Sequence, residues 1–539
     1  MIAKTTELCK IKLYDQMPFV WENAEHVFLR GQLCRKGAAV HAAELESSLQ
    51  GKGPGEIVNW LRDTGGCYQI IYCTPEYCVL IVDPCRTMPI FYAEEADGIR
   101  VYDHLGEEEL RLFGLDEPTA ALFQYMLCLP GTLTALTSVR QLQAGELLWY
   151  TKNGTYRERF YRVSYGDGLE QIQDAALAQK VVRFKLEAII DRLPEQIAGR
   201  TVLLPLSGGH DSRLLLYCLK KAHVGPILSY TYGTRSCNEY SLSKKVAAYY
   251  QIPHLFIEYK GKKVRKYYQK NYSRYAEFAG NYTSVPWMQE WYALGELLRR
   301  TGLNPHQCVV VSGLGSDFWA GSQLEKMRLP TDAPTVGDVV REYARERMNI
   351  SESNRTQEEE DSIRYAANVL LENAGQAGRD GFNAEELLEQ LIWEEHIAKF
   401  LMNGLRVYEY HHLLWLVPFM DTGWGETWLS MDRSLRIKRK LWSMLEASLY
   451  DPVLRAIPFE QNAEPHFLQK HLPDIWSLLE KHAQRHPEKL GHVWQLVYLP
   501  KKVNAENYKE NSGIWNAGVA FSAEYRKEVE TGYAGKHSE

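Results

Sequence analysis

The stretch Thr201–Arg213, which reads TVLLPLSGGHDSR, decides the fold of this chain. It opens with an almost entirely apolar run that predicts a buried strand, and the residues after it keep a helical apolar spacing. Between strand and helix, Gly208 and Gly209 let the backbone curl tightly and present successive N–H groups. With the hydroxyls of Ser207 and Ser212 beside them and the helix N-terminus behind, the turn predicts a socket for phosphate anions.

Asp211 lies in the middle of this turn, where a carboxylate would repel phosphate. Its sensible role is to hold Mg²⁺, which bridges phosphate oxygens. The turn lacks the lysine of the G-x-x-x-x-G-K-[ST] motif, which disfavours transfer of a γ-phosphate. The alternative is a tight strand-to-helix turn with an exposed carboxylate; the strand and helix around it favour the phosphate socket. His210 occupies a variable position, and we expect no catalytic role for it.

On both sides of this turn, strand patterns alternate with helix patterns, which predicts a parallel sheet. We expect strands at 201–206, 227–232, 254–258 and 309–311, and helices at 169–194, 213–222 and 240–250. The charged segment 329–379 predicts a solvated helical insertion. Asn383 is expected to cap a further helix, which carries one apolar face as far as Leu401.

Residues 1–165 carry short strand patterns instead. These patterns occupy 67–72, 78–82, 90–92, 99–102, 147–150 and 156–161. The last two flank Asn153-Gly154, the strongest short hairpin signal. Successive short strands predict an antiparallel, sheet-dominated domain.

The composition of the 539 residues is that of a globular protein, with 45% hydrophobic and 24% charged residues. A net charge of −6, without a basic block, argues against nucleic acid as a partner. No stretch approaches the roughly 20 apolar residues that span a bilayer, and the start has no signal-peptide pattern. Ten dispersed cysteines fit a reducing compartment. We therefore expect a soluble, cytoplasmic protein that binds no membrane.

The turn SGG-x-DS resembles the pyrophosphate-binding loop of ATP pyrophosphatases, and four further segments resemble asparagine synthetases. These segments are Ser229–Gly233, Ser312–Gly321, Val417–Asp421 and Arg436–Trp442. The resemblance implies ATP and Mg²⁺ as cofactors, with Asp211 and Asp317 as the metal ligands. The residues implied in binding ATP and pyrophosphate are Leu206, Ser207, Gly208, Gly209, Asp211, Ser212, Tyr232, Ser312 and Gly313. Lys438 and Lys440 compete for the catalytic role at the adenylate, with Lys438 preferred; the alternative is a basic surface cluster.

The first part of the chain resembles the glutaminase domain of the same family, at 65–68, 82–92 and 141–146. Such an enzyme needs a cysteine at position 2, where this sequence has Ile2. Cys9 would serve only after removal of eight residues, and nothing marks a processing site. We therefore expect no glutamine hydrolysis, and a packing role for Arg86, which occupies the place of a glutamine-binding residue.

The resemblance implies a two-domain fold of class α/β and α+β. A degenerate class II glutamine-amidotransferase-like domain, an Ntn-hydrolase-like antiparallel β sandwich, is expected in 1–165. A parallel α/β ATP pyrophosphatase domain with helical additions is expected in 166–450, followed by a C-terminal extension in 451–539.

The implied function is an amide-bond ligase that forms AMP and pyrophosphate, with a small-molecule or peptide carboxylate and an amine as substrates. Leu314 and Phe318 replace acidic residues of the family pattern, which makes aspartate and ammonia doubtful as the natural pair. A peptide macrocyclase of the lasso-cyclase type and a non-catalytic scaffold are the alternatives; the sequence also allows a homodimer. Thiolation of tRNA is disfavoured because C-x-x-C and a basic tail are missing.

The remaining cysteines and histidines have structural interpretations. Cys73 and Cys78 bracket a hairpin, where a disulfide is geometrically conceivable, but buried thiols fit a reducing cell better. A zinc or redox site among Cys67, Cys73, Cys78 and Cys85 lacks support. The pair His411-His412 has no further ligand at metal-binding spacing, so a structural or surface role is favoured.

Overall fold

The computed structural model describes residues 2–14, 18–166, 170–233, 238–324, 334–348, 356–374 and 383–459. Most of the expected extension 451–539 therefore lies outside the described residues. In the parts that are described, no helix is both long and apolar enough to cross a membrane. Below, residues 2–166 are called the sheet region and residues 170–459 the α/β region.

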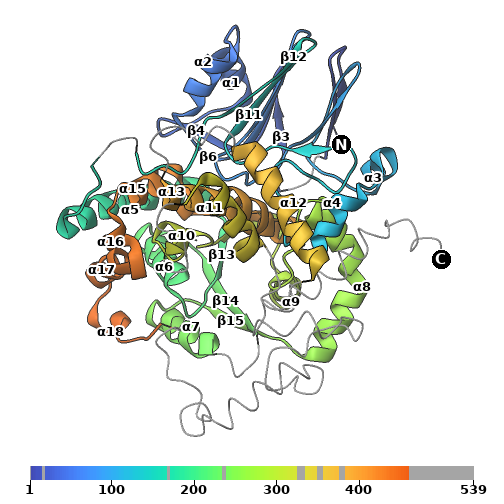
Figure 1. The fold of residues 1–539 in the computed structure, drawn as a ribbon. Coiled ribbons are helices and arrows are strands. Elements are labelled where there is room, and N and C mark those ends of the chain that lie inside the picture. The colour runs from blue at the N-terminus through green and yellow to red at the C-terminus, as the bar shows by residue number, and fades with distance from the viewer. Residues whose placement is uncertain are drawn as a thin grey trace.

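The sheet region consists of two β-sheets (Figure 1). The first has the strand order β1-β2-β9-β8-β10, formed by Ile2–Thr5, Cys9–Leu13, Gly98–Tyr102, Phe91–Glu95 and Arg140–Gln141. The second has the order β12-β11-β7-β6-β4-β3, formed by Gly154–Arg159, Glu146–Thr151, Cys78–Val82, Thr64–Cys73, Val27–Arg35 and Trp21–Asn23, with β5 (Ala38–Ala39) paired to β4. Buried side chains of both sheets share one core, so the sheets form a sandwich.

The hairpins follow the sequence patterns closely. Strands β11 and β12 pair in antiparallel register around Asn153-Gly154, and β6 pairs with β7 around the expected turn. One pairing differs, since β2 runs parallel to β9. These two strands lie far apart in the sequence, so no short turn forces them to be antiparallel. The outer face of the second sheet is covered by α1 (Ala42–Leu49) and α2 (Pro54–Leu61), which share a second core with it.

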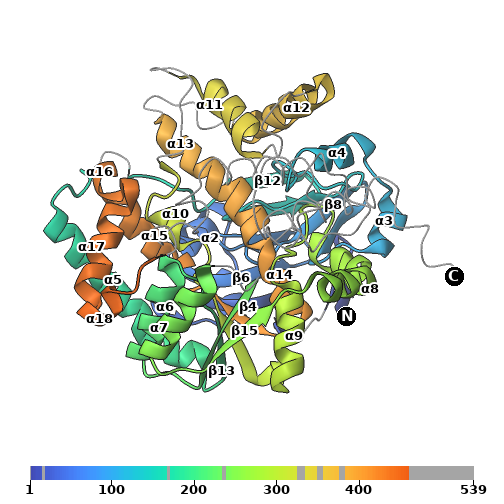
Figure 2. The same ribbon diagram turned by 90° about the horizontal axis from the view of Figure 1, so that it is seen from below.

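The α/β region contains a parallel sheet with the order β15-β14-β13-β16-β17. Its strands are His254–Glu258, Ile227–Gly233, Thr201–Pro205, Cys308–Val311 and Leu414–Leu416. The chain moves outward from β13 through α6 (His210–Lys221) and α7 (Asn238–Tyr249), then returns through α9 (Trp291–Thr301) to β16. Right-handed crossovers place these outward and return helices on different faces (Figure 2). The strand order therefore reverses between β13 and β16, which is where open α/β sheets bind ligands.

In the α/β region, one expected helix has different bounds and one strand was not predicted. Helix α5 (Ala175–Ile197) begins later than expected, where Asp174 accepts a hydrogen bond from the backbone of Leu177, and it continues past Pro194. A proline in the last turn removes only one backbone hydrogen bond, so it did not end the helix. Strand β17 was not predicted, since three residues carry too little periodicity.

Helical additions cover the α/β region. They comprise α8 (Gly261–Gly280), α10 (Ser316–Trp319), α11 (Val336–Tyr343), α12 (Gln357–Ala374), α13 (Ala384–Leu391), α14 (Arg406–Tyr410), α15 (Thr422–Leu429), α16 (Arg433–Arg436), α17 (Lys440–Leu449) and α18 (Pro452–Arg455), with π-helical turns at Ala344–Met348 and Ile392–Leu401. Asn383 caps α13 as expected, and its side chain accepts from the Glu385 and Glu386 backbones. The described part of the segment 329–379 is helical, but α11 buries Val339 and Val340 and is not solvated all round.

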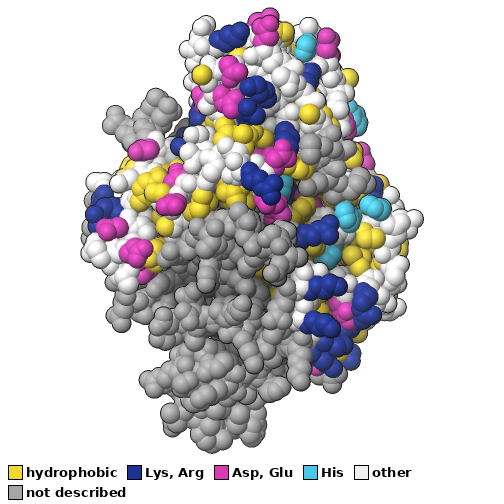
Figure 3. All heavy atoms as spheres, turned by 90° about the vertical axis from the view of Figure 1, so that its right-hand side faces the viewer, with side chains coloured by type: hydrophobic (Ala, Val, Ile, Leu, Met, Phe, Trp, Pro, Cys, Tyr) yellow, Lys and Arg dark blue, Asp and Glu magenta, His cyan; other side chains and the backbone are white. Residues whose placement is uncertain are grey.

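Helix α8 gives one side of the molecule a basic character. Its described side chains Lys263, Lys266, Lys270 and Arg274 are exposed. Figure 3 shows the side on which α8 lies, with Lys and Arg side chains gathered towards one edge of it.

Buried polar contacts join the sheet region to the α/β region. Trp393 donates from its indole nitrogen to the Pro84 carbonyl at 2.8 Å. Lys399, which is 1% exposed, donates to the carboxylate of Glu395 and to the Gly131 carbonyl, both at 2.6 Å. Because each contact satisfies a buried polar group, the two regions pack as a fixed interface.

A small hollow lies at this interface. It is lined on one side by Phe19, Gln32, Cys34, Gly66 and Cys67, and on the other by Ile189, Arg192, Gln196 and residues 415–418, 420 and 421. Asp421, in the segment Val417–Asp421, bonds Arg192 at 2.9 Å and caps α15 through the backbone of Trp424.

Candidate active site

The first glycine turn is organised by its own serine hydroxyls. The Ser207 backbone N–H donates to Ser212 Oγ at 3.1 Å, and the two hydroxyl oxygens lie 3.0 Å apart. The Gly209 N–H donates to Ser207 Oγ at 3.1 Å. Leu206 bonds the neighbouring strand, donating to the Tyr230 carbonyl at 2.9 Å. The turn is therefore preformed at the carboxyl end of β13, where the sequence predicted a phosphate socket.

The second glycine turn follows β16 and lies directly against the first. Gly313 packs on Asp211: a Cβ at position 313 would lie 3.1 Å from the Asp211 carbonyl carbon and from its Cβ. Beyond it, Gly315 adopts a φ of +79° close to the Met420 side chain, where a larger residue would clash. Adjacent parallel strands thus bring the predicted residues Ser312, Gly313 and Asp317 to the first turn.

The two predicted metal ligands, Asp211 and Asp317, lie close enough to repel one another. Burial, and next the negative charge of Asp317, raise the pKa of the Asp211 carboxyl well above its ordinary range. The Ser322 hydroxyl donates to Asp317 at 2.8 Å, and Arg439 Nη2 lies 3.5 Å from the same carboxylate oxygen.

These residues fit a divalent cation. Burial and the nearby charge of Asp317 disfavour ionisation of the Asp211 carboxyl, and a bound cation would offset both effects. Their hard oxygen donors match Mg²⁺, which takes one or two carboxylates together with phosphate oxygens. Asp211 and Asp317 are the residues that would hold it.

The segment Arg436–Trp442 reaches the same place by a strained turn. Lys438 and Arg439 both have positive φ, at +57° and +54°. Lys438 and Lys440 are exposed, whereas Arg439 is half-buried and forms the ion pair with Asp317. Sequence reasoning considered the lysines and missed Arg439, because only the fold shows which member of a basic run turns inward.

Arg436 fixes this segment to the rest of the site. It is 1% exposed and bonds both carboxylate oxygens of Glu389, at 3.0 and 2.6 Å. Its Nε donates to the Trp319 carbonyl at 3.2 Å, just after the second glycine turn. A Cβ on Gly321 would lie 2.8 Å from the Arg436 carbonyl oxygen, so the two segments touch. Arg436 therefore positions the lysine-bearing turn rather than facing solvent.

The end of β14 carries the predicted nucleotide residue Tyr232. Its ring stacks on Tyr259 with ring centroids 5.6 Å apart. The neighbouring Thr231 hydroxyl bonds the Leu206 carbonyl and lies 2.8 Å from Ser243 Oγ. These contacts tie the strand end to the first glycine turn.

A buried carboxyl group beside this strand was missed by the sequence analysis. Glu290 is bonded by the Tyr230 hydroxyl and, at 3.0 Å, by the Tyr408 hydroxyl. Burial raises its pKa to about 7, although both hydroxyls lower it. A glutamate just before α9 carries no sequence signal of this kind. Tyr408 also interacts with Ser312, which connects the carboxyl group to the second glycine turn.

His210 and Arg213 connect the first turn to the end of the described chain. His210 Nδ1 lies 2.7 Å from Glu446, and its ring stacks on Phe459 with centroids 3.7 Å apart. Arg213 donates to the carbonyls of Ile457 and Pro458 at 2.7 and 2.9 Å. His210 is thus packed beside the turn.

The other residues that the sequence analysis discussed lie outside the site described above. Arg86 is buried and donates to the Leu142 carbonyl at 2.8 Å and to Gln141 at 2.5 Å. Cys73 and Cys78 are buried and form no disulfide, which agrees with the expectation of buried thiols. His411 lies 3.2 Å from the Trp291 carbonyl, and His412 is exposed.

A family model matches the part of the chain that contains this site. Residues 195–456 match the family model described as asparagine synthase. The match supports the asparagine synthetase family and, with it, an ATP-using ligase that forms C–N bonds. The matched segment contains both glycine turns, Glu290 and the lysine-bearing turn. No curated protein matches the chain.

Solved structures give remote similarities. NMN synthetase from Francisella tularensis is 11% identical, with a TM-score of 0.20, covering 45% of this chain and 95% of that chain. Glutamine-dependent NAD+ synthetase from Acinetobacter baumannii is 12% identical, with a TM-score of 0.20, covering 51% and 52%. Glutamine phosphoribosylpyrophosphate amidotransferase from B. subtilis is 12% identical, with a TM-score of 0.17, covering 68% and 77%.

Proposed function

We propose that this chain is an amide-bond ligase that cleaves ATP to AMP and pyrophosphate and has no glutaminase activity of its own. It activates a carboxylate as an acyl-adenylate, which an amine then attacks. The observation that carries the proposal is the meeting of the two glycine turns, with Gly313 packed on Asp211 and the charge of Asp317 near enough to raise the pKa of Asp211.

In the first step, the substrate carboxylate attacks the α-phosphorus of ATP, and pyrophosphate leaves. The turn Ser207–Ser212, shaped by its serine hydroxyls, holds the departing pyrophosphate, and the N-terminus of α6 favours its negative charge. Mg²⁺, held by Asp211 and Asp317, supplies charge neutralisation at the phosphates when bound. The protein contributes mainly position and electrostatics, as in other reactions at phosphorus.

In the second step, the amine attacks the acyl carbon and AMP leaves. Lys438 is the residue we assign to the negative charge of the adenylate, with Lys440 as the competing candidate. Both are exposed on a turn that Arg436 and Arg439 anchor at the second glycine turn.

The absence of glutaminase activity is supported by the surroundings of two residues. Cys9 is 1% exposed, and its sulfur lies 3.6 Å from that of Cys78 inside the sandwich. A thiol in that place has no access to glutamine. Arg86 is held by Leu142 and Gln141 instead of facing a ligand.

The substrates we propose are a small-molecule or peptide carboxylate and an amine other than ammonia. Phe318 is fully buried and packs on Trp319 and Trp393, and Leu314 is half-buried. Neither position offers a carboxylate for a cationic substrate group. When both reacting groups belong to one peptide, the same chemistry gives a macrocycle, the alternative reaction.

The test is pyrophosphate release and ATP–pyrophosphate exchange, screened over carboxylates with and without amines. We expect carboxylate-dependent exchange that Asp211→Ala abolishes and Asp63→Ala, at an exposed ion pair with Arg35, leaves intact. Turnover that survives Asp211→Ala would overturn the ligase. If the protein does not bind ATP at all, the non-catalytic scaffold becomes the better interpretation. Hydrolysis of glutamine would refute the proposal that the protein has no glutaminase activity.

A further inference from the structure

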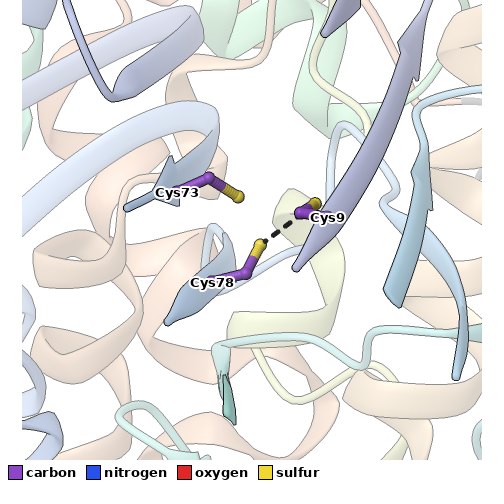
Figure 4. A group of neighbouring side chains, drawn as sticks. All are labelled: Cys9, Cys73 and Cys78. Carbon is purple, nitrogen blue, oxygen red and sulfur yellow. Dashed lines mark hydrogen bonds between the residues drawn. The ribbon is translucent and has the colours of Figure 1, made fainter. Parts of the chain in front are cut away.

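Three buried cysteines converge in the core of the sheet region (Figure 4). Cys9 comes from β2 in the first sheet, and Cys73 and Cys78 come from β6 and β7 in the second. Their exposed fractions are 1%, 0% and 0%. All three sulfur atoms lie within 4.8 Å of one another, and those of Cys78 and Cys9 are 3.6 Å apart.

The backbone holds these thiols in place before any ligand binds. Cys73 and Cys78 are directly opposed in the register of the β6–β7 hairpin, so their side chains lie on the same face of the second sheet. The Cys9 N–H donates to Thr6 Oγ1 at 2.9 Å, within the tight connection between β1 and β2. The cluster therefore bridges the two sheets, and sequence spacing could not reveal it because Cys9 lies in a distant strand.

The spacing matches metal coordination better than it matches a disulfide. Metal–thiolate bonds of about 2.3 Å separate sulfur ligands by about 3.8 Å in a tetrahedral and about 4.0 Å in a trigonal arrangement. The sulfur–sulfur separations of 3.6 Å and at most 4.8 Å bracket these values. A disulfide needs about 2.05 Å, and all three cysteines are free.

We propose that Cys9, Cys73 and Cys78 form a three-thiolate site for a thiophilic d¹⁰ cation, Zn²⁺ or Cu⁺, which links the two sheets of the sandwich. Each metal–sulfur bond forms as a thiol releases its proton to solvent, with no change of oxidation state. Soft sulfur donors select these cations over Mg²⁺ or Ca²⁺.

The choice between the two cations rests on opposing arguments. In the part of the chain that the structure describes, no further histidine, cysteine or carboxylate joins the cluster. Three donors favour Cu⁺, because structural zinc sites take four ligands. The apolar surroundings, which include Ile71, Leu80 and Leu148, favour the lower net charge that Zn²⁺ leaves on three thiolates.

The experiment uses the full chain, reduced and stripped of metal by a chelator, and titrates it separately with Zn²⁺ and with Cu⁺ against a chromophoric competitor. We expect one equivalent of one of these cations to bind and to raise Tm, since the metal binds the folded state. Cys9→Ser, Cys73→Ser and Cys78→Ser should each weaken binding at least about tenfold. Cys85→Ser, which alters a buried thiol outside the cluster, is the matched control.

The outcome does not depend on the ligase proposal, because no turnover is measured. Cys→Val variants, which keep the core apolar, replace any serine variant that does not fold. A wild-type chain that takes up neither cation overturns the site whatever the variants do. So does an equal loss in Cys85→Ser, or a disulfide within the cluster found in the freshly purified protein.

Discussion

Gly313 packs against Asp211, and this contact joins the two halves of the candidate active site. A Cβ added at position 313 would lie 3.1 Å from the carbonyl carbon and the Cβ of Asp211. That separation is tighter than ordinary van der Waals contact, and a backbone neighbour yields less easily than a flexible side chain. The position of Asp211 therefore depends on the absence of a side chain at residue 313.

Gly313→Ala should weaken ATP binding because it pushes the second glycine turn away from the first. We expect at least a tenfold rise in the Kd for Mg-ATP, on the order of 1.4 kcal/mol, measured by calorimetry. Gly55→Ala is the control, since nothing lies within 4 Å of a Cβ at that position. An unchanged Kd for Mg-ATP in Gly313→Ala would contradict this prediction, because nucleotide binding would then not depend on the close contact between the two turns.

Asp211→Asn should stabilise the metal-free protein while removing its response to Mg²⁺. The raised pKa of Asp211 means that the folded state resists its ionisation, so wild-type stability falls as pH rises through that titration. A neutral amide lacks this cost, and we expect a gain on the order of 1 kcal/mol at pH 9. Added Mg²⁺ with ATP should reverse the order of the two proteins in thermal denaturation, because only the wild type keeps both carboxylates.

Much of the site was predictable because it is local in sequence. The first turn needs only the strand before Ser207, the helix after Asp211 and the glycines between them. That Asp317 lies near Asp211 could be predicted only from the resemblance to asparagine synthetases. The hydrogen bond of Tyr408 to the buried Glu290 and the approach of Cys9 to Cys78 depend on packing between distant elements, which no local periodicity encodes.

Arg436→Gln should destabilise the protein more than a surface substitution does. It leaves the fully buried carboxylate of Glu389 without its bidentate partner, a loss of about 3–5 kcal/mol. Adding Glu389→Gln should recover part of that loss, because the uncompensated charge is removed. Chemical denaturation of both single variants and the double variant measures the coupling. If the free-energy changes of the two single variants add up exactly in the double variant, Arg436 and Glu389 do not stabilise each other as an ion pair.

Lys438→Ala should lower kcat by about 100-fold or more if this lysine stabilises the adenylate, with little effect on the KM for ATP. Lys440→Ala is the matched change on the same turn, and we expect it to be near neutral. The opposite ranking would transfer the role to Lys440. Arg439→Ala should act differently, altering the Mg²⁺ dependence through its ion pair with Asp317.

Glu290 should make the stability of the protein fall between about pH 4.5 and pH 7. Its folded-state pKa is raised from the ordinary 4.5 to about 7 by burial. The unfolded state loses its proton first over this interval, so it binds fewer protons than the folded state and stability declines as pH rises. Above about pH 7 the contribution levels off, at a total on the order of 2–3 kcal/mol.

Glu290→Gln should therefore flatten the difference in unfolding free energy between pH 5 and pH 8, measured with denaturant. The amide keeps one oxygen that accepts from a tyrosine hydroxyl and places an NH2 donor towards the other, since Tyr230 and Tyr408 bond different carboxylate oxygens, and it cannot titrate. Glu296→Gln is the control: Arg299 and Arg300 lower the pKa of Glu296 to about 2, so its titration lies below this window. An equal pH dependence in wild type and Glu290→Gln would mean that the Glu290 carboxyl does not titrate between pH 5 and pH 8, and that its burial is relieved by water.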